Sequence, residues 1–129
     1  MSRLQILLQK LDTLKLEQSE YAIFGSAQLG IKGLREVNDL DILVTKKAWN
    51  KLIKQYPNNV KEKRIVFGDI EIFYDWKPWF TNTKDLFQET EIIDNKPFLT
   101  LNKVLEFKRL RNKEKDRKDI ALIEEFLKK

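Results

Sequence analysis

The stretch that decides the fold is FGSAQLGIKGLREVNDLDILV, residues 24 to 44. It starts at the end of an apolar run that stops at Gly25 and finishes in a second apolar run that carries Asp39 and Asp41. Alternate residues of a β-strand point to the same side, so this strand would present both carboxylates together. Unpaired buried charge is unfavourable, and two close carboxylates repel unless a cation lies between them. The second run therefore predicts either half of a cation site, or a strand with Asp39 at its entrance and Asp41 facing solvent at a sheet edge.

A third carboxylate lies in the run IEIFYDW, residues 70 to 76. Glu71 stands between two isoleucines, which favours a strand, and a hairpin that reverses at Gly68 and Asp69 is predicted before it. Held beside the first two carboxylates, Glu71 would complete an oxygen-only site for two divalent ions, the arrangement that serves phosphoryl transfer. Asp69 and Asp75 compete for this role, and the alternative for Glu71 is a solvated position on the open face of the hairpin.

The residue types that are missing narrow the chemistry further. The 129 residues include no cysteine and no histidine, which excludes thiolate chemistry, zinc–thiolate sites and imidazole acid–base catalysis. A metal would need oxygen ligands, and these select hard cations such as Mg²⁺ or Mn²⁺. The formal net charge of +5 favours a negatively charged partner such as a nucleotide or nucleic acid, although a lysine-rich surface alone would give the same charge.

The hydrophobic pattern predicts one α/β (α+β) domain over residues 1–129. We expect a mixed sheet of four to five strands, flanked by helices and followed by a helical C-terminus. Leucines at helical spacing predict an opening helix, and Thr45 is a suitable cap for a helix after the second strand. Ser26 is predicted to cap a short helix over residues 26 to 33.

The later part of the chain is predicted to be irregular and then helical. Between residues 77 and 99, Pro78 and Pro97 are expected to act as breaks around a short edge strand, and two helices separated near Asn112 follow from Thr100. Three aromatic residues of the hairpin end are expected to stack on a base or to belong to the core: Trp76, Trp79 and Phe80.

The first of the two predicted C-terminal helices and the start of the second are basic. Between residues 103 and 118 there are eight Lys or Arg and three acids, an excess of five that equals the net charge of the chain. This segment is where phosphate or nucleic-acid contact is expected, and the alternative is a solvated face with local ion pairs. Arg35 is expected to pin the loop before Asp39 by pairing with a carboxylate or a phosphate.

A family resemblance rests on these same motifs. Gly25 and Ser26, a spacer of twelve residues and DLDI at residues 39 to 42 resemble the signature of the nucleotidyltransferase fold, the DNA polymerase β-like superfamily. IEIFYDWKPW (70 to 79) and FLTLNKVLEFKRLRNKEKDRKDIALIEEFL (98 to 127) are similar to small bacterial members of that superfamily. The resemblance extends over residues 20 to 128.

The resemblance implies a metal site and a catalytic base. In that family two aspartates bind two divalent ions, Mg²⁺ or Mn²⁺, and they match Asp39 and Asp41. The family's third acid, which helps to deprotonate the acceptor hydroxyl, best matches Glu71.

The resemblance also implies a nucleotide-binding turn. Gly25 and Ser26 correspond to the turn that approaches the triphosphate of an NTP, where glycine allows close approach and the following helix offers donors. Lys108 is expected to be a further contact of the triphosphate.

The implied activity is the transfer of a nucleoside monophosphate from an NTP to an acceptor hydroxyl, with release of pyrophosphate. Two alternatives stay open: a non-catalytic, antitoxin-like binding module of the same fold, and a basic nucleic-acid-binding domain. The acceptor could be a small molecule, a protein or RNA, and a homodimer or partner protein could supply its recognition. No apolar run approaches the roughly 20 residues that span a bilayer, so we expect no membrane partner and a cytoplasmic location.

Overall fold

A mixed β-sheet runs through the computed structural model, which describes residues 2–80 and 82–129. Seven strands make up this sheet in the described part of the chain: β1 (Tyr21–Phe24), β2 (Leu40–Val44), β3 (Val60–Lys61), β4 (Arg64–Phe67), β5 (Ile70–Phe73), β6 (Thr90–Ile93) and β7 (Lys96–Leu99). Their order across the sheet is β3-β4-β5-β2-β1-β7-β6. The two strands that carry the predicted carboxylates, β2 and β5, are therefore neighbours.

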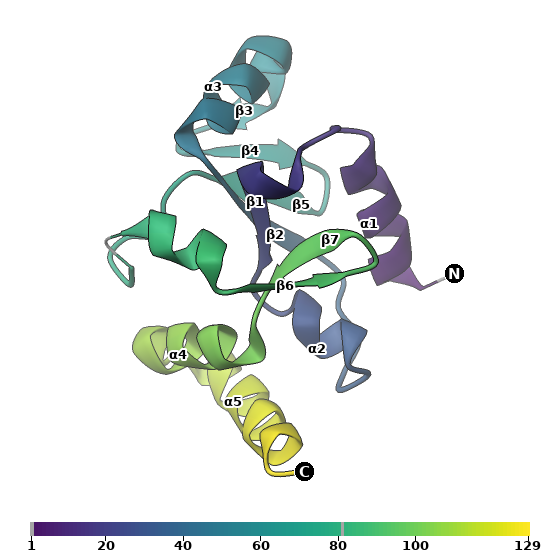
Figure 1. Ribbon diagram of the computed structural model, residues 1–129, viewed down its shortest axis with the longest axis vertical. Helices are drawn as coiled ribbons and strands as arrows, with labels where there is room; N and C mark the ends of the chain where they lie inside the picture. Colours follow the sequence, from purple (N-terminus) through teal and green to yellow (C-terminus); the bar gives the residue numbers. More distant parts are fainter. Residues whose placement is uncertain (1, 81) are drawn as a thin grey trace.

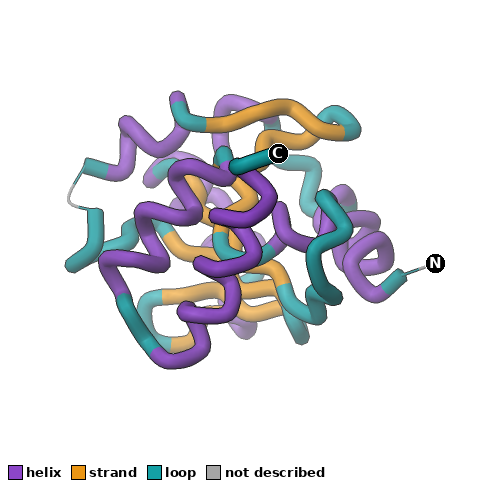
Figure 2. Tube along the Cα trace, turned by 90° about the horizontal axis from the view of Figure 1, so that it is seen from below, coloured by secondary structure: helices purple, strands orange, loops and turns teal. Residues whose placement is uncertain are grey.

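Helices flank the sheet and end the chain. The described α-helices are α1 (Arg3–Asp12), α2 (Ala27–Ile31), α3 (Lys46–Gln55), α4 (Leu101–Arg111) and α5 (Glu114–Leu127). Short 3₁₀ helices cover Gln18–Glu20, Pro57–Asn59 and Thr83–Gln88. Figure 1 shows α3 and α5 at opposite ends of the long axis of the molecule. Seen from below, the helix that leads to the C-terminus lies in front of the strands (Figure 2).

The predicted α/β architecture with a helical C-terminus is confirmed. The sheet is larger than the four to five strands expected because a two-residue strand, β3, extends one edge and β7 joins the other half. Pro97 was expected to be a break, but it lies inside β7 opposite Ile92 of β6. Only Phe98 of β7 is in register with β1, opposite Ile23, so the missing N–H of Pro97 costs little pairing there.

Both faces of the sheet are buried, and alternate residues of β2 serve different faces. Ile42 belongs to one hydrophobic cluster with the leucines of α1 and with Trp49 of α3. Leu43 belongs to a second cluster with side chains from α4 and α5. Because strand residues alternate, Asp41 is on the same side of β2 as Leu43, the side that the C-terminal helices cover.

The aromatic residues at the end of β5 join this second cluster. β5 ends at Phe73, and the chain after it turns toward the C-terminal helices. Trp76 packs against Phe24 with ring centroids 4.2 Å apart. The three hairpin-end aromatics named above all pack in or against this cluster, as expected for core residues.

Side chains cap α3 and α4 but not α2. Thr45 accepts a hydrogen bond from the N–H of Ala48, as predicted, and Thr100 does the same for Lys103. Ser26 stands at the N-cap position of α2 without a capping hydrogen bond, so that prediction was wrong. Its hydroxyl is engaged by a distant part of the chain, described below.

Candidate functional site

Asp41 and Glu71 are register partners on two neighbouring parallel strands. Asp41 of β2 lies opposite Glu71 of β5, between the pairs Leu40–Ile70 and Ile42–Ile72. In a parallel pair, opposed residues project to the same side of the sheet. Asp39 directly precedes β2, and all three carboxylates line one cavity of about 650 Å³.

The cavity joins three kinds of side chain. Two more acids, Asp69 and Asp75, contribute to its lining. Its cations are Lys63, Arg64, Lys77, Arg111, Lys113 and Lys115, and its aromatic residues are Phe73, Trp76, Trp79 and Phe107. Its volume falls within the range of small-molecule sites. The lining offers carboxylates for a cation, cations for an anion and rings for an apolar or aromatic group.

Asp41 is the acid of this cavity whose pKa is most clearly shifted. Burial first, and then the neighbouring charges of Asp39 and Glu71, raise the pKa of Asp41 from 3.8 to about 6. Arg111 and Lys108 act in the opposite direction but do not cancel the effect. The site therefore favours either a proton or another cation beside Asp41.

Three other acids of the cavity have partners of their own. Glu71 pairs with Arg64 of the neighbouring strand β4, with 3.4 Å between Oε2 and Nη1. Asp69 pairs with Arg3 of α1, and Asp75 accepts a hydrogen bond from the N–H of Lys77.

The carboxylates of the cavity have the chemistry that a hard divalent cation requires, although they do not converge on one point. Asp39, Asp41 and Glu71 offer only carboxylate oxygens, the ligands that Mg²⁺ and Mn²⁺ prefer. Within residues 2–80 and 82–129, no group of three or more Asp or Glu side chains is arranged closely enough to hold a metal ion. A cation bound here would draw these carboxylates together and compete with Arg64 for Glu71.

Gly25 is placed against the carboxylate of Asp41. Its φ of +65° belongs to the left-handed region, and a β carbon at this position would stand 2.8 Å from Oδ2 of Asp41. Glycine is therefore required here both by the backbone and by the carboxylate beside it.

Ser26 and Lys108 meet each other, away from the lining of the cavity. The ammonium of Lys108 donates to Oγ of Ser26 at 3.1 Å and pairs with Asp119 at 2.9 Å. The Ser26 hydroxyl donates in turn to Asp119 at 3.1 Å. The Lys108 side chain is only 3% exposed. The structure thus brings these two predicted nucleotide contacts together, but it engages both with Asp119.

Asp119 is the centre of a buried ion network that sequence reasoning did not identify. Arg35 donates to both of its oxygens, at 2.7 and 2.9 Å, so the predicted pairing of Arg35 with a carboxylate is confirmed. Burial acts to raise the pKa of Asp119, but the hydrogen bonds from Arg35 and Lys108 outweigh it and lower the pKa to about 2. The network fastens α5 to the turn after β1 and to the loop before β2.

Arg111 and Asp116 form a second pair beside this network. Nε of Arg111 donates to Oδ2 of Asp116 at 2.9 Å and Nη2 donates to Oδ1 at 2.5 Å. Asp116 is fully buried. Burial opposes its ionisation, but the hydrogen bonds from Arg111 and from the N–H of Lys113 lower its pKa.

One sequence signal pointed toward these acids. Asp116 and Asp119 are three residues apart on the predicted last helix, and residues at that spacing share a helix face. That face is turned to the basic helix α4, and the shared spacing could have indicated ion pairs between the two helices. Four of the eight basic residues counted above are in ion pairs within the described part of the chain: Lys103, Lys108, Arg109 and Arg111.

Comparison of the chain with protein-family models, with curated proteins and with solved structures gave no match in any of the three. Among the described helices, none combines the length and the apolar character needed to cross a membrane.

Proposed function

We propose that the protein transfers a nucleoside monophosphate from an NTP to an acceptor hydroxyl at the cavity lined by Asp39, Asp41 and Glu71. The observation that carries the proposal is the parallel register of Asp41 with Glu71, which puts the motif acids of two distant segments on one cavity. The resemblance of residues 24 to 44 to the nucleotidyltransferase signature supports the same assignment.

The three carboxylates would hold Mg²⁺ or Mn²⁺. A divalent ion supplies charge stabilisation to the transferring phosphoryl group and lowers the pKa of a bound hydroxyl. The negative charges of Asp39 and Glu71 disfavour the ionised form of Asp41. A bound cation would offset this repulsion, so the repulsion favours cation binding at this site.

The transfer itself exchanges one P–O bond for another. The acceptor oxygen attacks the α-phosphorus of the NTP, a new P–O bond forms, and the bond to the β-phosphate oxygen breaks. Pyrophosphate leaves with that electron pair. Glu71, at the cavity wall, takes the proton of the acceptor hydroxyl, as its neighbour Asp41 helps to hold the reacting groups.

The rest of the lining suits a nucleotide. Lys63, Lys77, Lys113 and Lys115 put positive charge around the carboxylates, where the phosphates of an NTP would lie. Trp79 offers an aromatic ring on the same cavity, and its edge-to-face contact with Phe107, at 5.4 Å between centroids, holds it in place.

A binding module without catalysis is the second candidate, and one observation favours it. Glu71 is paired with Arg64 at 3.4 Å, and a carboxylate that contacts a cation is less free to contact the acceptor hydroxyl. Such a module would bind an NTP or a partner in the same cavity and release no pyrophosphate. It is the antitoxin-like alternative of the sequence interpretation.

A transfer assay separates these candidates. The purified protein is incubated with each of the four NTPs, labelled on the α-phosphate, with Mg²⁺ or Mn²⁺ and with RNA, protein or small-molecule fractions as acceptors. We expect label transfer and pyrophosphate release with the wild type, loss of both with Glu71→Gln, and no change with Glu125→Gln, an exposed position on α5.

Binding measured alongside gives the decision. If the wild type binds an NTP by calorimetry but transfers no label to any fraction, the binding module replaces the enzyme. If it neither binds nor transfers, the proposed function is refuted.

A further inference from the structure

Arg111 is a cation that α4 contributes to the cavity. It is the last residue of α4 and lines the same cavity as Asp41. Its charge is near enough to lower the pKa of Asp41. An arginine so placed next to a proposed NTP site has two roles open to it: a structural partner of Asp116, or a ligand of the phosphates.

Lys108, the sequence-predicted phosphate ligand, is engaged by partners inside the protein. Its ammonium has three donors, and three oxygens surround it: Ser26 Oγ at 3.1 Å, Asp119 at 2.9 Å and Asp116 at 3.7 Å. It is buried and does not line the cavity. Freeing it would take one cation away from two buried aspartates, which is costly.

Arg111 has hydrogen-bond donors that its pair with Asp116 does not use. A guanidinium carries five N–H donors, and the pair with Asp116 uses Nε and Nη2. Within residues 2–80 and 82–129, Nη1 has no hydrogen-bond partner. The guanidinium carbon also lies 4.8 Å from the centre of the Phe107 ring, which fixes the plane of the group from a second side.

The geometry points to Arg111 as the residue that binds the phosphates of the nucleotide, with Asp116 as the positioning residue that orients its guanidinium. The guanidinium of Arg111 is planar; Asp116 holds one of its edges and the Phe107 ring covers one of its faces. Its remaining N–H donors therefore point in a fixed direction, which suits a phosphate oxygen. This inference rests on the proposed function for the identity of the ligand, but not on catalysis.

Inorganic tripolyphosphate tests it, because this ion carries the phosphates of an NTP and has no nucleoside to transfer. Its affinity is measured by calorimetry at fixed Mg²⁺ for the wild type, Arg111→Gln and Arg111→Lys. We expect Arg111→Gln to weaken binding about 10- to 100-fold, the loss expected for a hydrogen bond to a charged group. Arg111→Lys should recover part of this loss, since it keeps the charge without the fork.

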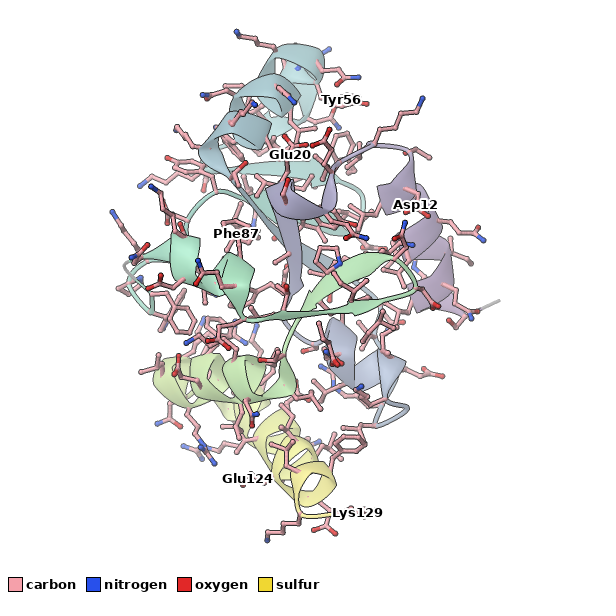
Figure 3. The ribbon with its side chains drawn as sticks, in the orientation of Figure 1. Asp12, Glu20, Tyr56, Phe87, Glu124 and Lys129 are labelled. Carbon is pink, nitrogen blue, oxygen red and sulfur yellow. The ribbon has the colours of Figure 1, made fainter. Side chains whose placement is uncertain are left out.

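Arg109 provides the matched control on the same helix. It is exposed and pairs with Glu124 of α5 at 2.6 Å, and Figure 3 shows Glu124 toward the end of the molecule where the chain terminates. Arg109 is absent from the cavity lining. Arg109→Gln removes the same charge from α4 and should change tripolyphosphate affinity by less than about twofold if the effect of Arg111 is local.

A double variant tests whether weaker tripolyphosphate binding results only from a destabilised fold. Arg111→Gln leaves Asp116 buried without its main partner, so the double variant Arg111→Gln with Asp116→Asn removes both charges. It should melt cooperatively and still bind tripolyphosphate as weakly as the single variant.

The outcomes separate this inference from the proposed function. Wild-type affinity in the folded double variant, or no tripolyphosphate binding by the wild type, overturns the role of Arg111 whatever the transfer assay gives. Weakened binding in the Arg111 variants, with no label transfer by the wild type, supports Arg111 and refutes the enzyme.

Discussion

Asp41 and Glu71 lie opposite each other on parallel strands, and the charge of Glu71 contributes to the raised pKa of Asp41. No turn or short-range motif brings them together. Their proximity results from a sheet in which β5, after a hairpin with β4, is laid beside β2. The same relationship makes the ionised pair unfavourable for folding, and a cation between the two carboxylates would relieve that cost.

Asp41→Asn is expected to stabilise the fold while it abolishes activity. The change removes a carboxylate whose ionisation is disfavoured first by burial and then by Asp39 and Glu71. In the metal-free protein at pH 8 we expect unfolding to require about 1–3 kcal/mol more. The rate of label transfer should fall by more than about 100-fold. This is a larger loss than is typical when a residue that only orients a metal ligand is replaced. Urea denaturation in EDTA and the label-transfer assay measure the two effects, and a destabilised variant would contradict the electrostatic account.

Gly25→Ala is expected to damage the site more than it damages the fold. Residue 25 has φ +65°, where a side chain costs about 1–2 kcal/mol, and its β carbon would crowd Oδ2 of Asp41. Gly33→Ala is the matched control because Gly33 has φ +73° and nothing within 4 Å of an added β carbon. Both variants should lose similar stability by thermal denaturation. Only Gly25→Ala should weaken Mg²⁺-dependent NTP binding, and equal binding by the two would show that the close contact is unimportant.

Lys108→Met is expected to be among the most destabilising single changes in the basic segment. The change removes a cation that the buried residues Asp119 and Asp116 share. The free energy of unfolding, measured by urea denaturation, should fall by about 3–5 kcal/mol. Lys103→Met, on the same helix with a partly exposed pair to Glu106, should cost less than about 1 kcal/mol. The double change Lys108→Met with Asp119→Asn should cost less than the sum of the single changes; simple additivity would argue against direct coupling.

Acid should weaken the fold through Asp119. Its pKa is about 2 in the folded protein and 3.8 ordinarily, so its charge contributes stability above about pH 4 that disappears as the pH falls through 2. The difference of these pKa values corresponds to about 2 kcal/mol. The unfolding free energy of the wild type should therefore fall more steeply between pH 5 and 2 than that of Asp119→Asn. Parallel pH profiles would rule out this contribution.

Local patterns predicted most elements of the fold. Alternation around Ile42 and Ile72 indicated the two strands, and the Thr45 cap and the turn at Gly68 were found where the sequence put them. These signals depend on neighbouring residues only. The errors at Pro97 and Ser26 have different causes. Pro97 pairs with Ile92 in the hairpin of β6 and β7, whereas the hydroxyl of Ser26 donates to Asp119, 93 residues along the chain.

The site was less accessible to sequence reasoning than the fold. The motif residues Asp39, Asp41 and Glu71 were identified, but the pairing of Glu71 with Arg64 depends on the hairpin register. Lys108 and Arg111 are alike as basic residues of one helix, three positions apart. Only tertiary packing decides that one is buried among aspartates and the other borders the cavity.

The position of β1 between β2 and β7 has a consequence for the nascent chain. One side of β1 can pair as soon as β2 is made, but the other side must wait for β7. The Ser26 hydroxyl must wait longer, since its partner Asp119 follows 93 residues later. At the usual pace of about 5–20 residues per second, that interval is on the order of 5–20 s. Strand β2, which carries Asp41, is thus synthesised early and the ion network of α5 late. The hydrogen bond of Ser26 to Asp119, next to the turn at Gly25, can form only after all of the described strands have been synthesised.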